Sequence, residues 1–148
     1  MEKALVSVRL AIVPAADLRM HEEPEPDRVR RVIRSVRSSG VVKKAIAVDG
    51  KTMVVLDGVH RLSALKALGC VRIPVSLMDY ASDDVVVYAK GGKTLFPKEK
   101  VIGAALSGHM LPPKSTRHMV RQEDGRLVHI SKVEKDVSIP LASLMRPA

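Results

Sequence analysis

Aromatic residues are scarce in this sequence, which has one Phe, two Tyr and no Trp among its 148 residues. Hydrophobic residues still make up 46% of the chain, so we expect a globular protein whose core is built from aliphatic side chains. Proteins that bind single-stranded nucleic acids usually stack the bases on aromatic rings, so the scarcity of such rings argues against this function.

Cysteines and long apolar runs are also missing. Cys70 is the only cysteine, which excludes an intrachain disulfide and a cysteine-based metal site. No apolar run approaches the roughly 20 residues of a membrane-spanning helix, and the N-terminus has no signal-peptide pattern. We therefore expect a soluble protein of the cytoplasm with no membrane partner.

Positive charge is in excess, with 25 Lys and Arg against 16 Asp and Glu, a net charge of +9 and a pI near 10.0. Such a balance favours binding to the phosphates of nucleic acids, but it equally fits small anionic ligands or the surface of a thermophile's protein. The length suits one hydrophobic core, so we expect one compact unit.

The central stretch of the chain combines a strand, a glycine turn and a helix. A strand at residues 52–56 leads through Asp57-Gly58 into a helix whose leucines recur at helical spacing. Free backbone N–H groups and the positive end of the helix dipole then lie beside His60 and Arg61, which suits a phosphate. Alternatively, Asp57 caps the helix and Arg61 pairs with a surface acid.

The remaining patterns predict alternating strands and helices, so the expected fold class is α+β. Strands are predicted at residues 5–13, 45–48, 73–78, 85–88 and 127–130, and helices at residues 28–38, 98–106 and 141–145. Asp49-Gly50 predicts a hairpin between two of the strands. Asp27 is the expected N-cap of the arginine-rich helix 28–38, which should pack its apolar residues against the core.

Two further clusters carry chemically active groups. In His21-Glu22-Glu23, a carboxylate whose pKa is raised by burial could accept a proton from an alcohol, although the pattern alone favours an exposed acidic loop. Residues 114–118 combine two cations, two hydroxyls and an imidazole in a segment predicted to be a loop. This segment fits a site for a carboxylate or phosphate, or a solvated basic loop.

These blocks together resemble a known family. The run Asp57-Gly58-Val59-His60-Arg61 is similar to the D-G-H-H-R signature of ParB/sulfiredoxin-like domains, and in particular of archaeal free L-serine kinases. The other matching blocks follow in the family's order: His21-Glu22, Ser35-Val36 with Ser39-Gly40, residues 79–88, and Pro113-Lys114-Ser115-Thr116-Arg117-His118.

The resemblance implies a ParB/sulfiredoxin-like fold, with a small mixed sheet flanked by helices and a phosphate site between a strand and a helix. It implies a nucleotide-binding core at residues 1–90 and a shortened C-terminal lobe at residues 91–148. The lobe would carry the substrate loop that ends in residues 114–118, and the two parts would form one compact unit.

The implied activity is phosphorylation of free L-serine to O-phospho-L-serine, in serine and cysteine metabolism, with ATP or ADP as donor and Mg²⁺ as cofactor. Glu22 and Asp57 would be catalytic, and the chain alone would hold no metal. The residues that would bind nucleotide or phosphate are Gly58, His60, Arg61 and Ser35. The residues that would bind serine are Lys114, Ser115, Thr116, Arg117 and His118.

The sequence departs from the family at three places. Val59 stands where the signature has its first His, Ala89-Lys90 stands where a Trp is usual, and the stretch between Lys90 and Leu111 is short.

The alternative function is that of a ParB-like, nucleotide-dependent DNA-binding protein, but no helix-turn-helix segment follows the core. Sulfiredoxin chemistry is excluded because its turn needs a cysteine where this chain has Val59. The donor nucleotide and the oligomeric state stay open.

Overall fold

The structure is a computed structural model that describes residues 3–147, and its centre is a five-stranded mixed sheet. The strands lie in the order β1 (Arg9–Pro14), β6 (Arg72–Met78), β4 (Ile46–Asp49), β5 (Val54–Asp57) and β2 (Arg19–Met20). β4 pairs antiparallel with β5, as the predicted hairpin requires, and parallel with β6. The predicted mixed sheet is therefore confirmed.

The sheet separates two hydrophobic cores. In β5, Val55 faces the first core, while Val54 and Leu56 face the second. This alternation follows from the two-residue period of a strand, and burial on both faces explains why β4 and β5 read as unbroken apolar runs. The first core is completed by α2 (Val59–Ala67), which contributes Leu62 and Leu65.

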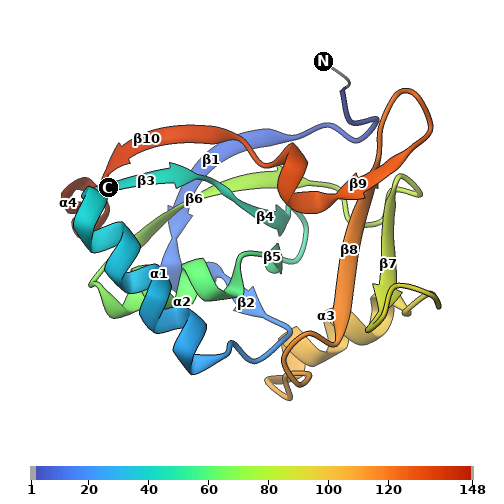
Figure 1. Cartoon of the computed structure of the whole chain (residues 1–148), viewed down its shortest axis with the longest axis horizontal. Helices are drawn as coiled ribbons and strands as arrows, with labels where there is room; N and C mark the ends of the chain where they lie inside the picture. Colours follow the sequence, from blue (N-terminus) through green and yellow to red (C-terminus); the bar gives the residue numbers. More distant parts are fainter. Residues whose placement is uncertain (1–2, 148) are drawn as a thin grey trace.

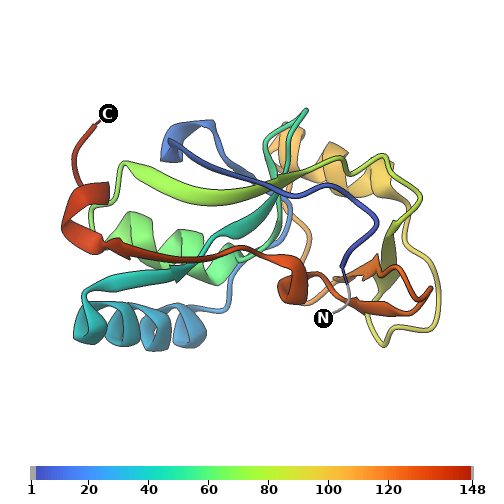
Figure 2. The ribbon, with the colours of Figure 1, turned by 90° about the horizontal axis from the view of Figure 1, so that it is seen from above.

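α1 (Pro26–Ser39) covers α2 on the side away from the sheet, as Figure 2 shows. None of its residues is fully buried, but its apolar residues are half-buried, and Val36 packs against the first core as expected. Their burial is only partial because α1 packs on α2 rather than on the sheet. The expected N-cap is wrong, because Pro26 occupies the first turn and Glu25 precedes it. Proline suits this position, where its missing N–H has no partner to lose.

A three-stranded antiparallel sheet and α3 (Lys98–Ser107) enclose the second core, at the right of Figure 1. The strands are β7 (Val85–Ala89), β8 (Thr116–Arg121) and β9 (Leu127–His129). The predicted loop at residues 114–118 is wrong in its second half, because Thr116 and His118 pair with Ala89 and Val87 of β7. Among residues 3–147, no helix is long and apolar enough to span a membrane.

The C-terminal segment returns to the first core. β10 (Asp136–Pro140) pairs antiparallel with β3 (Val41–Lys44), and α4 (Leu141–Leu144) adds Leu141 and Leu144 to the first core. β2, β3 and β10 have no counterpart among the predicted strands because they are short and lie at sheet edges, where hydrophobic alternation is weak. The division of the chain at residue 90 stays a prediction.

Leu144→Ala is expected to lower the free energy of unfolding by about 2–4 kcal/mol, because the side chain is fully buried and its removal leaves a cavity. Met145→Ala is the matched control, since Met145 is 41% exposed and should change the free energy by less than about 1 kcal/mol. Urea denaturation measures both. Equal effects would show that α4 is not anchored in the core.

Candidate functional site

A cavity of about 620 Å³ collects most of the predicted site residues. Its lining comes from the segment before α1, the turn between β5 and α2, the end of β7 and the start of β8. The predicted residues that line it are Glu22, Asp57, Gly58, His60, Arg61, Lys114, Thr116, Arg117 and His118. Two predicted residues, Ser35 and Ser115, do not line it. The size is typical of a site for a small ligand.

The turn between β5 and α2 requires glycine. Gly58 has φ +108°, and a Cβ added there would lie 2.5 Å from Cγ2 of Ile46. Gly58 is also the N-cap of α2, and no side chain caps the helix. The alternative role of Asp57 as a cap is therefore wrong, and the first-turn N–H groups of α2 are left for a ligand in the cavity.

His60 presents a neutral imidazole to the cavity. Its Nε2 accepts a hydrogen bond from the backbone N–H of Glu25 at 2.9 Å. Burial, followed by the charge of Arg28, lowers the pKa of His60. The proton of the neutral ring therefore resides on Nδ1, which can donate to an anionic oxygen.

Glu22 is held as a carboxylate by a segment far along the chain. Its Oε1 accepts hydrogen bonds from the backbone N–H of Thr116 at 2.7 Å and from its hydroxyl at 2.5 Å. Burial raises the pKa of Glu22, but hydrogen bonds from His21 and Thr116 and the charge of His21 outweigh it, so the pKa is lowered. The expectation of a raised pKa is therefore wrong.

His21 connects Thr116, the hydrogen-bond partner of Glu22, to the backbone of β5. Its Nδ1 lies 2.9 Å from the carbonyl oxygen of Val55, which only accepts, so Nδ1 carries a proton. Its Nε2 lies 3.1 Å from Thr116 Oγ1, whose single proton goes to Glu22. His21 and Glu22 therefore share Thr116 as a hydrogen-bond partner, and the hydrogen bond and charge of His21 lower the pKa of Glu22.

Residues 114–118 split between the cavity and the surrounding structure. Lys114 lies 3.6 Å from the carboxylate of Glu25 at the cavity rim. Ser115 instead donates to the carbonyl oxygen of Pro112 at 2.6 Å and stabilises the turn. His118 is buried, with Nε2 2.9 Å from the hydroxyl of Tyr80.

His118 is expected to make the protein less stable in acid. Burial, reinforced by charge at His21, His129 and Lys98, lowers the pKa of His118 well below its usual 6.5. Below pH 6.5 the unfolded chain binds a proton at His118 that the folded chain does not, so stability is lost as the pH falls. The slope approaches about 1.4 kcal/mol per pH unit for one proton.

Urea denaturation between about pH 7 and about pH 5 measures this slope. His118→Gln should flatten it, whereas His109→Gln, at an exposed position, should leave it unchanged. An unchanged slope in His118→Gln would contradict the assignment.

Sequence reasoning missed several cavity residues. Arg28, in the helix predicted at residues 28–38, was not among the predicted site residues, but it lines the cavity because the start of α1 faces the turn before α2. Lys90 and His129 line the cavity as well. Lys90 lies two residues after the matching block at residues 79–88, so that block was the available signal, whereas His129 follows no matching block.

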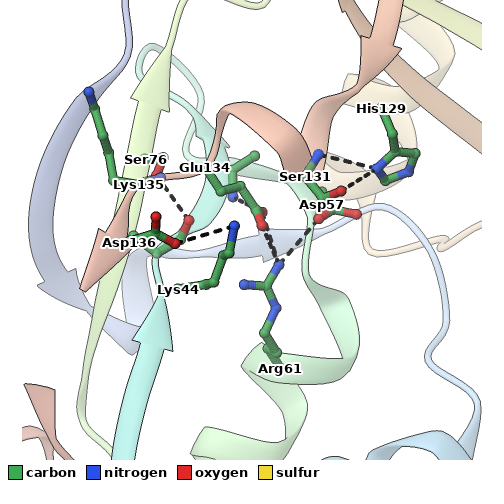
Figure 3. A network of polar contacts seen from close by, with 11 residues as sticks. Lys44, Asp57, Arg61, Ser76, His129, Ser131, Glu134, Lys135 and Asp136 are labelled. Atoms are coloured by element: carbon green, nitrogen blue, oxygen red, sulfur yellow. Dashed lines mark hydrogen bonds and ion pairs between the residues drawn. The ribbon is translucent and has the colours of Figure 1, made fainter. Parts of the chain in front are cut away.

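Arg61 is paired with a buried acid. Its Nη2 donates to both carboxylate oxygens of Glu134, at 2.7 and 2.9 Å, and to Asp57 at 3.2 Å (Figure 3). The alternative of a surface ion pair is therefore wrong, since the side chain of Glu134 is 1% exposed. Burial raises the pKa of Glu134 to about 8, against the opposing charge of Arg61.

Ser35 lies in a second cavity of about 460 Å³. This cavity runs between α1, β3 and the 3₁₀ turn at Ile130–Val133, and its wall includes Val36, Val42 and Leu65. Val32 and Arg61 line both cavities, so the two adjoin at these side chains.

Within the described residues, no group of three or more His, Cys, Asp or Glu side chains is arranged to hold a metal ion. Mg²⁺ at phosphoryl-transfer sites is commonly held by one or two carboxylates together with substrate phosphates. Glu22 and Asp57 line the same cavity and supply carboxylates of this kind, so the donor set fits Mg²⁺ bound together with a nucleotide.

Comparisons with known proteins bear on this site. No family model matches the chain. It is 32% identical over 94 residues to an ATP-dependent L-serine kinase of Staphylothermus marinus, covering 61% of this chain and 35% of the relative. It is 37% identical over 75 residues to the ADP-dependent L-serine kinase SerK of Thermococcus kodakarensis, covering 48% of this chain and 31% of the relative. The chain thus spans about a third of the length of the curated relatives it matches.

A solved free serine kinase in complex with AMP superimposes with a TM-score of 0.75 at 17% identity, covering 93% of this chain and 94% of the other. The chain has the fold of the free serine kinases. The predicted α+β class is therefore confirmed. The serine-kinase fold brings Glu22, the Asp57-Gly58 turn and the start of β8 to one cavity, although 94 residues separate Glu22 from Thr116.

Proposed function

We propose that this chain is a free L-serine kinase of the cytoplasm, which transfers a phosphoryl group from ATP or ADP to the hydroxyl of L-serine. The product, O-phospho-L-serine, would enter serine and cysteine metabolism. One observation carries the proposal: a fixed carboxylate, Glu22, lines the same cavity as an uncapped helix N-terminus and several cations. The similarity to L-serine kinases supports serine as the acceptor.

The phosphates of the donor bind at the start of α2. The first-turn N–H groups donate to phosphate oxygens, and the helix dipole favours their negative charge. The Nδ1–H of His60 and the guanidinium of Arg61 add donors on the same side of the cavity. Arg28 and Lys90 contribute further positive charge. Phosphoryl transfer depends mainly on such positioning and charge neutralisation.

Glu22 accepts the proton of the serine hydroxyl as the serine oxygen bonds to phosphorus and the donor's terminal P–O bond breaks. Its Oε1 is held by Thr116, and within residues 3–147 no hydrogen bond occupies Oε2, which is therefore available to the hydroxyl. A weak base suffices, because the transition state of phosphoryl transfer is loose and needs little prior deprotonation. Asp57, on the facing turn, orients the reacting groups.

L-serine binds between Glu22 and the start of β8. Lys114 and Arg117 line the cavity there and pair with the serine carboxylate through charge-assisted hydrogen bonds. Thr116 fixes Glu22, and His118, which is hydrogen-bonded to Tyr80 of the second core, supports the cavity wall. Ser115, which stabilises the turn, would shape this segment rather than touch serine.

The nucleoside occupies the second cavity, which adjoins the first at Val32 and Arg61. Its apolar wall suits a purine ring, and Ser35 offers a hydroxyl to the ribose. Mg²⁺, held by the nucleotide phosphates with Asp57, would neutralise phosphate charge.

The alternative function is nucleotide-dependent DNA binding. It is favoured by the exposed arginines on the outer face of α1, which are Arg30, Arg31, Arg34 and Arg37. Binding that depends on these residues would fall steeply with salt, because counterions are released from the duplex.

The test supplies purified protein with L-serine and Mg²⁺, and with ATP or ADP in separate reactions. Mass spectrometry measures O-phosphoserine, and EDTA-treated reactions are the control. We expect product with at least one donor and none without nucleotide. No product with either donor, together with salt-sensitive duplex binding, would favour the alternative.

A further inference from the structure

Glu134 connects the C-terminal segment to the turn between β5 and α2. Its side chain is 1% exposed and accepts three hydrogen bonds, two from Arg61 Nη2 and one from the backbone N–H of Ala47 at 2.9 Å. In Figure 3, the carboxylates of Glu134 and Asp57 lie next to each other, and both face Nη2 of Arg61. Glu134 precedes β10 and lies 73 residues from Arg61 in sequence.

The three bonds that Arg61 donates to these acids all leave from one nitrogen. Nη2 holds both Glu134 and Asp57, and among the described residues no hydrogen bond is made by Nη1 or Nε. A guanidinium is a rigid planar fork, so fixing Nη2 also fixes the direction of the other N–H groups. Arg61 lines both cavities, at their junction.

We propose that Glu134 is a positioning residue that holds Arg61 in the orientation needed to bind the phosphates of the donor nucleotide. Through this contact the C-terminal segment supports the phosphate site at the start of α2. The role of Arg61 at the phosphates rests on the proposed function above, whereas the orientation of Arg61 by Glu134 does not.

A competing role for Glu134 predicts the opposite change in nucleotide affinity. If Glu134 instead competed with phosphate for Arg61, removing its charge would release the guanidinium and tighten nucleotide binding. Positioning predicts weaker binding, because a mobile Arg61 loses conformational entropy when it binds.

The test measures ADP and ATP binding by calorimetry for Glu134→Gln, Glu134→Asp and the wild type. The titrations are made at pH 9, above the pKa of about 8 of Glu134, where its side chain is a carboxylate. We expect affinity to fall about tenfold in Glu134→Gln, since a charge-assisted pair is lost, and to recover in part in Glu134→Asp. Asp136→Asn is the matched control, because Asp136 lies on the same segment but is exposed and forms its ion pair with Lys44. Its affinity should stay within about twofold of wild type.

A double-mutant cycle separates positioning from general damage. In an Arg61→Ala background, Glu134→Gln should have no further effect on nucleotide affinity, because Glu134 acts through Arg61. Additive losses, or tighter binding in the single variant, would overturn the proposal.

Nuclear magnetic resonance of the Arg61 side chain tests the orientation without nucleotide. The wild type should show hindered, slowly exchanging guanidinium protons that Glu134→Gln loses. Unchanged signals would overturn the positioning role even if the wild type bound no nucleotide, whereas absence of nucleotide binding alone would count against the proposed function.

Discussion

Replacing Glu22 with Gln is expected to lower kcat for serine phosphorylation by about 10²–10⁴-fold, with nucleotide affinity within about twofold of wild type. Gln keeps the size of the side chain and an oxygen that accepts the hydrogen bonds from Thr116, but it cannot take up the hydroxyl proton. Steady-state kinetics and calorimetric titration with AMP measure the two quantities.

Glu23→Gln is the control for this prediction, because Glu23 is the adjacent carboxylate and lines the same cavity but is exposed. Its kcat should stay within a few-fold of wild type. Full turnover in Glu22→Gln would remove Glu22 from the chemistry. A parallel loss in both variants would indicate that the acidic loop acts only through its overall charge.

Replacing Gly58 with Ala is expected to lower the free energy of unfolding by about 2–4 kcal/mol, from a strained backbone and a steric clash together. The φ of +108° disfavours any side chain, and the new Cβ would lie 2.5 Å from Cγ2 and 2.8 Å from Cβ of Ile46. Ile46 is itself fully buried and cannot move away without disturbing the first core. Urea denaturation measures the loss.

Gly69→Ala separates the two causes. Gly69 has φ +94° with no atom within 4 Å of the added Cβ, so its substitution should cost only the backbone strain, about 1–2 kcal/mol. Gly58→Ala should therefore cost more than Gly69→Ala. Equal losses would contradict close packing of Ile46 against the turn.

Local sequence signals predicted the turn at the centre of the site. Asp57 ends a strand, Gly58 permits the left-handed turn, and the leucines at helical spacing define α2. These features depend on neighbours within a few residues, so period and turn chemistry are enough to find them. Leu62 and Leu65 are buried as that period predicts.

The other features of the site depend on contacts between residues far apart in the sequence, and no local pattern encodes such contacts. The pKa of Glu22 is lowered by Thr116 and by the adjacent His21, whose own orientation depends on the Val55 carbonyl. In the sequence, Glu134 is one acid in a polar segment with no sign of a partner, and only the fold shows that it pairs with Arg61. The position of α1 over α2 also depends on the tertiary structure, because the sequence pattern shows only which face of the helix points inward.

The most direct test of the account is ³¹P nuclear magnetic resonance of one reaction that contains the wild-type protein, Mg²⁺, L-serine and the donor nucleotide. The account predicts that the resonance of O-phosphoserine grows in equal amount to the nucleotide that has lost one phosphoryl group, and that omitting serine stops both. Release of inorganic phosphate without O-phosphoserine, or no change in the donor with either ATP or ADP, would contradict it.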